Sequence, residues 1–344
     1  MSRFREEIGE QPLLASRMLV ESRGAVASIA ARLSTYRPRG FVIVARGSSD
    51  HAALYAKYLF GVRNHMMVAL AAPSLFTSYG SPPSLDGQCV IGISQSGVSP
   101  DVIAVIDEAV RQGAVTVALT NDPGSPLAQA AELVFPLGAG PERSVPASKT
   151  YIASLLALAL ISQALDPDAS FEAALGQVPP ALAAVLEQDG ELDRVVPALL
   201  GARAIVLGRG FNFSTAEEIA LKLTETSYVL ARAWSVADFE HGPIAVVEPG
   251  FPVVLVDGRG QVSADVQSIG RRLTDHGCRI IRLLDGTGDD SHQEATVSLD
   301  SGLPEELTPL TLGVLGQLLA HRVALARGID PDRPRALNKV TRTW

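Results

Sequence analysis

Short apolar runs alternate with segments of helical periodicity along most of the 344 residues. Runs rich in Val, Ile and Leu that end at polar or Gly-containing turns predict strands. The predicted strands cover 41–45, 67–71, 90–93, 114–119, 133–138, 204–208, 252–257, 279–284 and 295–299. Helices are expected before and between them, including the long apolar stretches 152–165 and 307–326. Strands that alternate with helices indicate parallel sheets covered on both faces, which is an α/β fold.

The pattern of the first half recurs in the second half. The stretch 204–225 repeats the apolar strand, the Arg-Gly turn and the helix of 41–60, and aligning Ala45 with Gly208 gives an offset of 208 − 45 = 163 residues. An internal duplication explains this period, and a chain of this length has room for two domains. We expect N-terminal helices, a first domain, a second domain and a C-terminal tail over residues 1–36, 37–178, 179–328 and 329–344, respectively.

A hydroxyl-rich turn follows the predicted strand at 90–93. It reads SQSGVS over 94–99 and leads into a helix that starts near Asp101. The unpaired N–H groups and the dipole at the start of a helix attract anions. A single Ser would fit an ordinary helix cap, but four polar donors within six residues favour a phosphate monoester. Ligands of parallel sheets bind beyond the carboxyl ends of the strands, where Ser49 and Thr120 are also expected.

Composition and charge exclude several classes of protein. With a formal net charge of −8 and a pI near 5.3, the chain lacks the clustered basic residues that nucleic-acid binding requires. No apolar run reaches the roughly 18 residues of a membrane span, and the polar start is unlike a signal peptide. Cys89 and Cys278 fit no metal spacing, so we expect reduced core thiols in a cytoplasmic protein. Neither a metal nor an organic cofactor is indicated.

Several motifs together resemble one protein family. The stretches ARGSSDHA (45–52), SQSGVSPD (94–101), EEIALKLTETSY (217–228), FEHGP (239–243) and DRPRALNKVT (332–341) are similar to the sugar-isomerase (SIS) domain family. The resemblance is closest to the isomerase half of glucosamine-6-phosphate synthase and runs from near residue 5 to the C-terminus. It implies two tandem, doubly wound SIS domains, each with a five-stranded parallel sheet, in a homodimer that binds a phosphorylated sugar or amino sugar.

The resemblance also implies a phosphosugar site in the first domain. The phosphate would lie among residues of the two hydroxyl-bearing turns, namely Gly47, Ser48, Ser49, Ser94, Gln95, Ser96 and Ser99. The second half has no hydroxyl-rich counterpart, so one phosphate site is expected. Residues near Val145, including Ala147, would hold the sugar hydroxyls. This loop reads SVPASKTY where the family tends to have GVASTKAF, so Ala147 replaces a sugar-contacting Ser and leaves the identity of the sugar open.

Three residues match catalytic positions of the family, and a fourth, Lys222, is a candidate because of its spacing from one of them. Glu225 matches the base that moves a proton between C1 and C2, and Lys222, one turn earlier, would keep that carboxylate ionised or stabilise the enediol. His241 matches the histidine that opens the sugar ring and comes from the neighbouring subunit. Lys339 matches a lysine that forms a Schiff base with a ketose, on a tail that closes over the active site. Without the resemblance, these residues would fit a surface helix pair, a turn histidine and a solvated lysine.

The reaction is inferred from a difference to the synthase. That family carries a glutaminase domain before its isomerase half, whereas only about 36 residues precede the first predicted strand here, too few for such a domain. We therefore expect a deaminase of the glucosamine-6-phosphate type, which isomerises an amino-sugar phosphate and releases ammonia without hydrolysing glutamine. A plain phosphosugar isomerase is an alternative. A non-catalytic phosphosugar sensor is a second alternative, although no DNA-binding segment accompanies the predicted domains.

Overall fold

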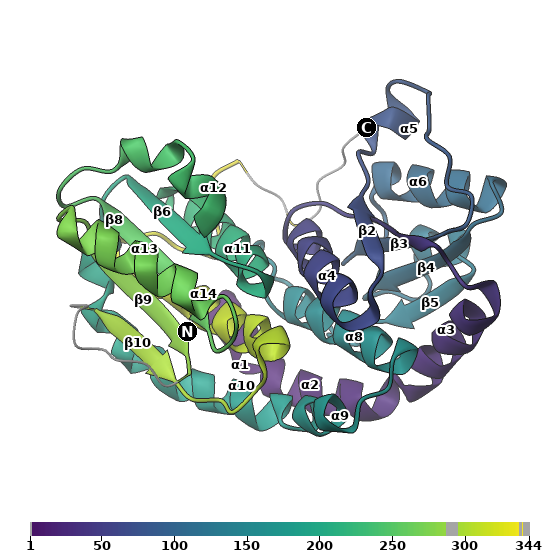
Figure 1. Cartoon of the computed structure of the whole chain (residues 1–344), viewed down its shortest axis with the longest axis horizontal. Coiled ribbons are helices and arrows are strands. Elements are labelled where there is room, and N and C mark those ends of the chain that lie inside the picture. Colours follow the sequence, from purple (N-terminus) through teal and green to yellow (C-terminus); the bar gives the residue numbers. More distant parts are fainter. Residues whose placement is uncertain (1, 287–294, 337–338, 340–344) are drawn as a thin grey trace. The chain divides into compact units, whose positions relative to one another are not determined.

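The structure is a computed structural model that describes residues 2–286, 295–336 and 339. It contains two five-stranded sheets, with the strand orders β2-β1-β3-β4-β5 and β10-β9-β8-β6-β7 (Figure 1). Every strand pair in both sheets is parallel. Read from the edge strands β2 and β7, the two orders are the same, which confirms the predicted α/β fold with two doubly wound sheets.

The first sheet is built from the predicted strands of the first half. Its strands are β1 (Gly40–Val44), β2 (Met67–Leu70), β3 (Gln88–Ser94), β4 (Val115–Thr120) and β5 (Leu133–Pro136). The helices α3 (Arg23–Tyr36), α4 (Ser48–Asn64) and α8 (Lys149–Leu165) cover one face, and α5 (Ser74–Thr77), α6 (Pro100–Arg111) and α7 (Pro126–Ala130) cover the other. The two central strands, β3 and β4, are almost wholly buried, as their apolar runs require.

The second sheet repeats this plan. Its strands are β6 (Arg203–Gly208), β7 (Leu230–Ser235), β8 (Pro252–Gly258), β9 (Arg279–Asp285) and β10 (Thr296–Leu299). The helices α11 (Phe211–Ser227) and α14 (Thr308–Ala326) pack on one face, and α12 (Val236–Glu240) and α13 (Ser263–Asp275) on the other. The sequence pattern did not predict β7, because this edge strand is only partly buried and lacks an apolar run.

The chain divides into two compact units, each with one sheet. The first-sheet unit comprises 13–142, 149–176 and Lys339, and the second-sheet unit comprises 2–12, 143–148 and the described part of 177–336. The remaining elements are the helices α1 (Arg3–Gly9), α2 (Gln11–Glu21), α9 (Ala169–Gly176) and α10 (Val178–Glu187), and the 3-10 turns η1 (Gln188–Arg194), η2 (Val196–Leu199), η3 (Pro243–Val246) and η4 (Glu305–Leu307). The helix α1 thus belongs with the second sheet, whereas α3 and the part of α2 from Leu13 on belong with the first.

The duplication extends to backbone angles. The helices α4 and α11 each have 17 residues and start 163 residues apart. Gly47 before α4 has φ 56° and ψ −132°, and Gly210 before α11 has φ 57° and ψ −131°. Both helices end at a residue with φ 55°, His65 and Tyr228. The two halves therefore share one backbone design, as the offset of 163 residues predicts.

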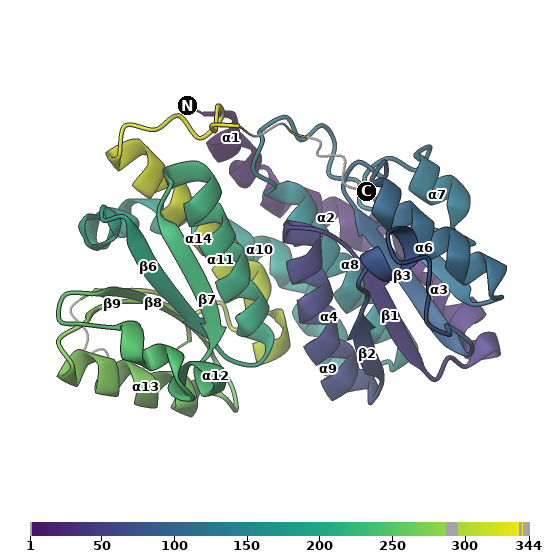
Figure 2. The same ribbon diagram turned by 90° about the horizontal axis from the view of Figure 1, so that it is seen from above.

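The longest helix, α14, is a core helix (Figure 2). By length and composition, 305–326 is long and apolar enough to cross a membrane, contrary to the expectation that no apolar run reaches that length, and among the described residues the bent pair 169–176 and 178–194 passes the same test if it counts as one span. However, 83% of the most apolar window of 305–326 is buried inside the protein. An added Cβ on Gly316 would lie 2.2 Å from Cγ1 of Ile219, so this glycine lets α14 approach α11 closely.

Cys89 and Cys278 are buried free thiols, as expected.

Candidate active site

A five-residue turn joins β3 to α6 and presents the predicted hydroxyls. The hydroxyl oxygens of Ser94 and Ser99 lie 3.3 Å apart, and the N–H of Gly97 donates to Ser94 Oγ at 3.2 Å. Ser99 stands at the N-cap position of α6, but its hydroxyl makes no capping hydrogen bond to that helix. An ordinary helix cap therefore does not explain Ser99. Together with Gln95 and Ser96, both half-buried, these hydroxyls stand at the start of a 12-residue helix.

The loop that follows β4 holds this turn in shape. Gly97 has φ 65°, and a Cβ on it would lie 2.1 Å from Ser125 Oγ and 2.9 Å from Thr120 Oγ1. The Gly97 carbonyl accepts the N–H of Leu127 at 3.0 Å. Thr120 itself is fully buried, so it supports the turn from behind. Both the backbone conformation and the close approach require glycine at position 97.

The turn between β1 and α4 brings further predicted residues to the same edge of the first sheet. Because β1 and β3 are adjacent and parallel, Ser48 and Ser49 in the first turn of α4 follow the same carboxyl edge as Ser94. Ser48 is buried and Ser49 is half-buried. The backbone angles of Gly47 are ones that other residues rarely adopt. The two predicted turns thus meet at one edge of one sheet.

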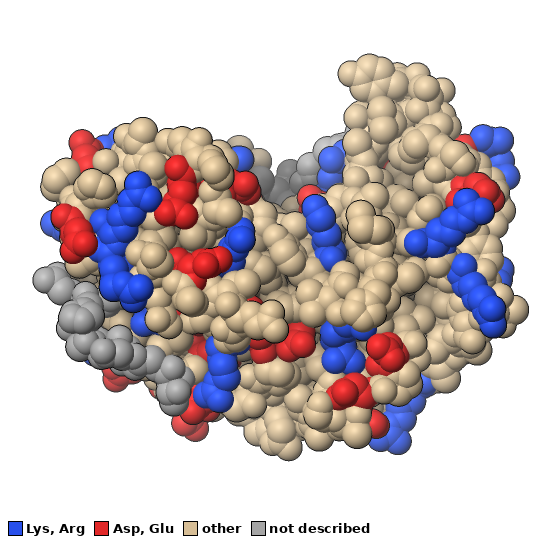
Figure 3. Space-filling view, in the orientation of Figure 1, with Lys and Arg blue, Asp and Glu red and all other residues tan. Residues whose placement is uncertain are grey.

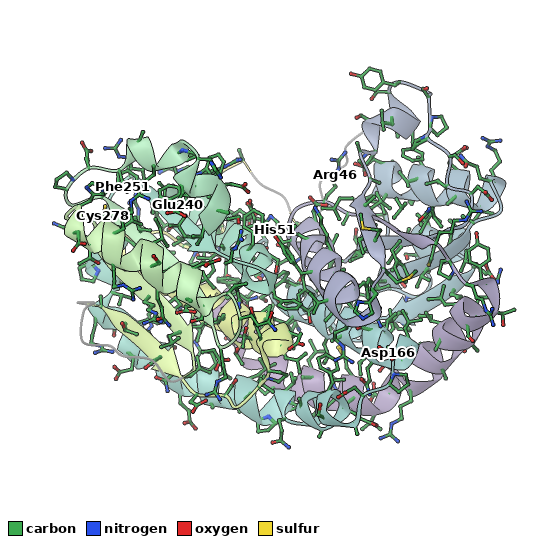
Figure 4. The ribbon with its side chains drawn as sticks, viewed as in Figure 1. Arg46, His51, Asp166, Glu240, Phe251 and Cys278 are labelled. Carbon is green, nitrogen blue, oxygen red and sulfur yellow. The ribbon has the colours of Figure 1, made fainter. Side chains whose placement is uncertain are left out.

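An ion pair ties these two turns together. The guanidinium of Arg46, which is labelled in Figure 4, donates from Nε to the carboxylate of Asp101 at 2.6 Å. Asp101 lies in the first turn of α6. The Asp101 side chain is 1% exposed, whereas that of Arg46 is 52% exposed. The second-sheet unit has the same pair, Arg209 with Asp265 at 3.3 Å, although its turn lacks the hydroxyls. The ion pair therefore belongs to the shared fold, and the hydroxyls are what distinguish the first turn.

The second-sheet unit contains the predicted base and lysine on α11. Lys222 Nζ lies 2.7 Å from Glu225 Oε2 and 3.5 Å from Glu218 Oε1. The side chains of Lys222 and Glu218 are 1% exposed, and that of Glu225 is 25% exposed. This is not a surface helix pair, because the ammonium is buried between two carboxylates and only Glu225 reaches solvent. Sequence analysis missed Glu218, although its spacing of four residues before Lys222 was a usable signal.

Among the described residues, His241 takes no part in the ion pairs of the Lys222 cluster. It follows α12 in a turn whose next residue, Gly242, has φ 152°, and its side chain is exposed. Within the described residues, the imidazole forms no hydrogen bond or ion pair with Glu225. An exposed ring fits a residue that serves a neighbouring subunit, but this role stays a prediction.

The loop expected to hold the sugar is braced by the N-terminal helix. One carboxylate oxygen of Glu7 on α1 accepts the N–H of Arg143 at 2.5 Å and that of Ser144 at 3.2 Å, and the Ser144 hydroxyl donates to the other oxygen at 2.5 Å. Glu7 and Ser144 are buried, whereas Val145 and Ala147 are half-buried. The loop shape thus depends on Glu7, which sequence analysis did not select because it lies 136 residues before Arg143.

Lys339 is anchored by a buried carboxylate in the first-sheet unit. Its Nζ lies 2.8 Å from Oε2 of Glu142, whose side chain is 0% exposed. Glu142 also accepts the N–H of Thr150 at 3.0 Å and the Thr150 hydroxyl at 2.9 Å. Lys339 is therefore not a solvated tail lysine. Glu142 escaped the sequence analysis because its partner lies 197 residues away.

Among the residues that the structure describes, no group of three or more His, Cys, Asp or Glu side chains could hold a metal ion. On the face seen in Figure 3, positive and negative side chains are interspersed, and no single basic patch stands out. The first-sheet unit supplies the hydroxyl cradle and an ion-paired amine. The second-sheet unit supplies a carboxylate held by a buried ammonium.

Comparison with known proteins identifies the family. The family model for the SIS domain matches residues 36–163 and 201–327. A glutamine–fructose-6-phosphate aminotransferase (isomerizing) from Thermococcus kodakarensis is 33% identical over 344 residues, which cover 97% of this chain and 57% of that protein. The chain thus spans somewhat more than half the length of the curated relatives that it matches.

Two solved structures resemble this chain in both sequence and fold. A protein from Silicibacter pomeroyi described as a phosphosugar isomerase is 34% identical, with a TM-score of 0.88 over 96% of this chain and 100% of that chain. The C-terminal domain of glucosamine-fructose-6-phosphate aminotransferase from Francisella tularensis is 26% identical, with a TM-score of 0.88 over 97% of this chain and 98% of that chain. Both likenesses extend over nearly the whole of this chain.

Proposed function

The chain belongs to the SIS domain family, and on this premise we propose that it is an enzyme that binds a phosphorylated amino sugar, isomerises it between aldose and ketose, and releases ammonia. The observation that carries the proposal is the buried ammonium of Lys222, 2.7 Å from the partly exposed carboxylate of Glu225. A carboxylate that is partly exposed and paired with a buried cation suits a base that moves a proton between adjacent carbons.

The phosphate is assigned to the cradle of the first-sheet unit. The hydroxyls of Ser94 and Ser99 stand at the start of α6 without capping it, and the backbone there is fixed by Gly97. Hydroxyl and amide donors at a helix N-terminus suit a phosphate monoester without requiring a fixed positive charge. The related proteins named for phosphosugars support this assignment.

Glu225 and Lys222 are assigned to the proton transfer. Glu225 removes the proton from one carbon and returns it to the next, while the ammonium of Lys222 stabilises negative charge on the enediol oxygens. Glu218, 3.5 Å from Lys222 on its other side, holds that ammonium in place. Replacing Glu218 with Gln should lower turnover through Lys222 and leave phosphate affinity unchanged.

The remaining steps are assigned to Lys339 and His241. Glu142 holds the Lys339 amine by an ion pair of 2.8 Å and is placed to take its proton, which frees the amine to attack the carbonyl of a ketose and expel water. His241 opens the sugar ring as acid and base near neutral pH. We assign His241 to the active site of the partner subunit in a homodimer. The cytoplasmic location of the protein also stays a prediction.

The release of ammonia is the most specific part of the proposal. The balanced reaction converts an amino-aldose phosphate and water into a ketose phosphate and ammonia. The names of two relatives describe an aminotransferase that acts on a sugar phosphate, in one case with isomerisation, and this favours an amino sugar as the substrate of this chain. A plain phosphosugar isomerase is the second candidate, because the relative at 34% identity is described as one.

The test is ammonia release from glucosamine 6-phosphate, coupled to detection of fructose 6-phosphate. We expect release by the wild-type protein and loss of about 10² to 10⁴ in rate in Glu225→Gln, since that is the usual contribution of a general base. Glu248→Gln is the matched control, because Glu248 is an exposed carboxylate of the same unit in a surface ion pair with Arg203. Isomerisation of neutral phosphosugars without ammonia release would establish the plain isomerase instead.

The shared histidine has its own test. We expect His241→Asn and Glu225→Gln to be inactive alone. If His241 serves the partner's site, a mixed dimer of the two variants contains one site with both native residues, so mixing should restore activity. Mixing that restores nothing would mean that His241 and Glu225 of the same chain act together.

A further inference from the structure

The second-sheet unit keeps the frame of the cradle but not its hydroxyls. Gly210 repeats the backbone angles of Gly47, and the ion pair between the two turns is also repeated. The turn from β8 to α13, residues 259–262, reads RGQV and carries no hydroxyl. Ser263 follows it, as Ser99 stands before Asp101 in the first-sheet unit, but its hydroxyl donates to Asp257 at 2.7 Å. If the frame alone defined an anion site, this unit would have one too.

A carboxylate of the same chain occupies this second turn. Glu305 Oε2 accepts the N–H of Gln261 at 2.8 Å, and the N–H of Val262 also donates to this carboxylate. A Cβ built on Gly260 would lie 1.8 Å from Oε2, so the carboxylate lies directly against the backbone. The 13-residue helix α13 begins at Ser263, which places the carboxylate at its N-terminus.

The first-sheet unit contains a counterpart of Glu305 with other partners. Pro304-Glu305 follows Pro141-Glu142 by 163 residues, the same offset that separates β10 from β5. Glu142 accepts from Thr150 and pairs with Lys339. The two copies of one glutamate have thus diverged. One holds the tail lysine, and the other fills the turn that corresponds to the phosphate cradle.

The charges around the second turn also oppose a phosphate. Burial raises the pKa of Glu305, and repulsion by Glu306 and Asp257 raises it further, while the amide groups of Gln261 and Val262 lower it. Nearby carboxylates that make a single negative charge costly make a phosphate dianion costlier still.

We propose that Glu305 is the resident anion of the second-sheet unit and closes its cradle, so that the chain binds one phosphosugar and not two. This proposal depends on the proposed function only in naming a phosphosugar as the ligand of the first cradle. Its direct consequence is measured by calorimetric titration of the wild-type protein with glucosamine 6-phosphate, for which we expect one site per chain. Two sites per chain would overturn it. An absence of binding would count against the proposed function and leave the closure to be decided by the variants.

The variants test whether the second cradle needs an anion. Glu305→Ala should melt at a lower temperature than the wild type, and sodium acetate should raise its melting temperature more than sodium chloride of equal ionic strength does. Glu248→Ala is the matched control, because it removes an exposed carboxylate of the same unit. We expect its response to acetate to equal that of the wild type. An unchanged melting temperature in Glu305→Ala, or an acetate response no larger than that of the control, would overturn the closure.

A third variant separates charge from shape. Glu305→Gln keeps the side-chain length and an acceptor oxygen for the N–H of Gln261, so it should fold and show no specific acetate response. A specific response of this variant to acetate would contradict the assignment of Glu305 to the cradle. If Glu305→Ala fails to fold, Glu305→Gln and the wild-type titration still decide the proposal.

Discussion

Gly97→Ala should damage the first cradle more than its backbone angle alone explains. The substitution incurs two costs. A non-glycine residue at φ 65° costs roughly 1–2 kcal/mol, and the new Cβ would also lie 2.1 Å from Ser125 Oγ and 2.4 Å from Ser125 Cβ. Relieving such an overlap typically costs about 1–3 kcal/mol. We therefore expect a loss of about 2–5 kcal/mol in the free energy of unfolding.

Gly80→Ala is the matched control for the backbone cost. Gly80 has φ 57°, and an added Cβ there would meet nothing within 4 Å. This variant should lose only the first component, so the difference between the two variants measures the overlap at Gly97. Chemical denaturation gives both values, and the titration with phosphosugar should show weaker binding, by about tenfold or more, in Gly97→Ala alone.

A second substitution tests the cause. Ser125→Gly removes the two atoms nearest to the new Cβ, so the double variant Gly97→Ala with Ser125→Gly should be more stable than the sum of the two single effects predicts. If Gly97→Ala and Gly80→Ala are equally destabilised, or if the two changes at 97 and 125 simply add, the steric reasoning is refuted.

Two further predictions follow from groups outside the turn. Arg46→Gln removes the ion-pair partner of the buried Asp101 and should lower the free energy of unfolding by about 1–3 kcal/mol. Arg209→Gln should lower it by at most about 1 kcal/mol, because its partner Asp265 is 55% exposed. Equal losses in chemical denaturation would contradict the expectation that the more buried carboxylate depends more on its partner. Burial lowers the pKa of His321, so the unfolded chain takes up a proton at this residue first as pH falls below its ordinary value of 6.5. Stability should therefore decrease over that range and decrease less in His321→Gln, and parallel pH profiles of melting temperature would refute this.

The fold could be predicted where a segment's fate depends on its own residues. The buried strands carry apolar β-branched runs, so β3 and β4 were found, whereas the partly buried edge strand β7 has the mixed sequence LARAWS and was missed. The hydroxyls of 94–99 could be singled out because they are neighbours in the chain. The burial of Lys222 between two carboxylates depends on how α11 packs and was only partly foreseen.

Contacts between distant segments could not be predicted from local patterns. Glu142 and Lys339 are separated by 197 residues, and each looks unremarkable in its own surroundings. Glu305 and Gln261 are separated by 44 residues and meet only because η4 follows β10 back toward α13. The repeat offset did relate Glu142 to Glu305, but the different partners of the two residues are set by tertiary structure.

The central claim is that Glu225 moves a proton between C1 and C2 of a bound phosphosugar. The most direct measurement is proton NMR of fructose 6-phosphate incubated with the protein and ammonium in D₂O. We expect the wild-type protein to replace a C1 proton with deuterium, and Glu225→Gln, which still binds the phosphosugar, to leave it in place. Exchange at the wild-type rate in Glu225→Gln would show that Glu225 is not the base, and binding by the wild-type protein without exchange would show that no proton is moved.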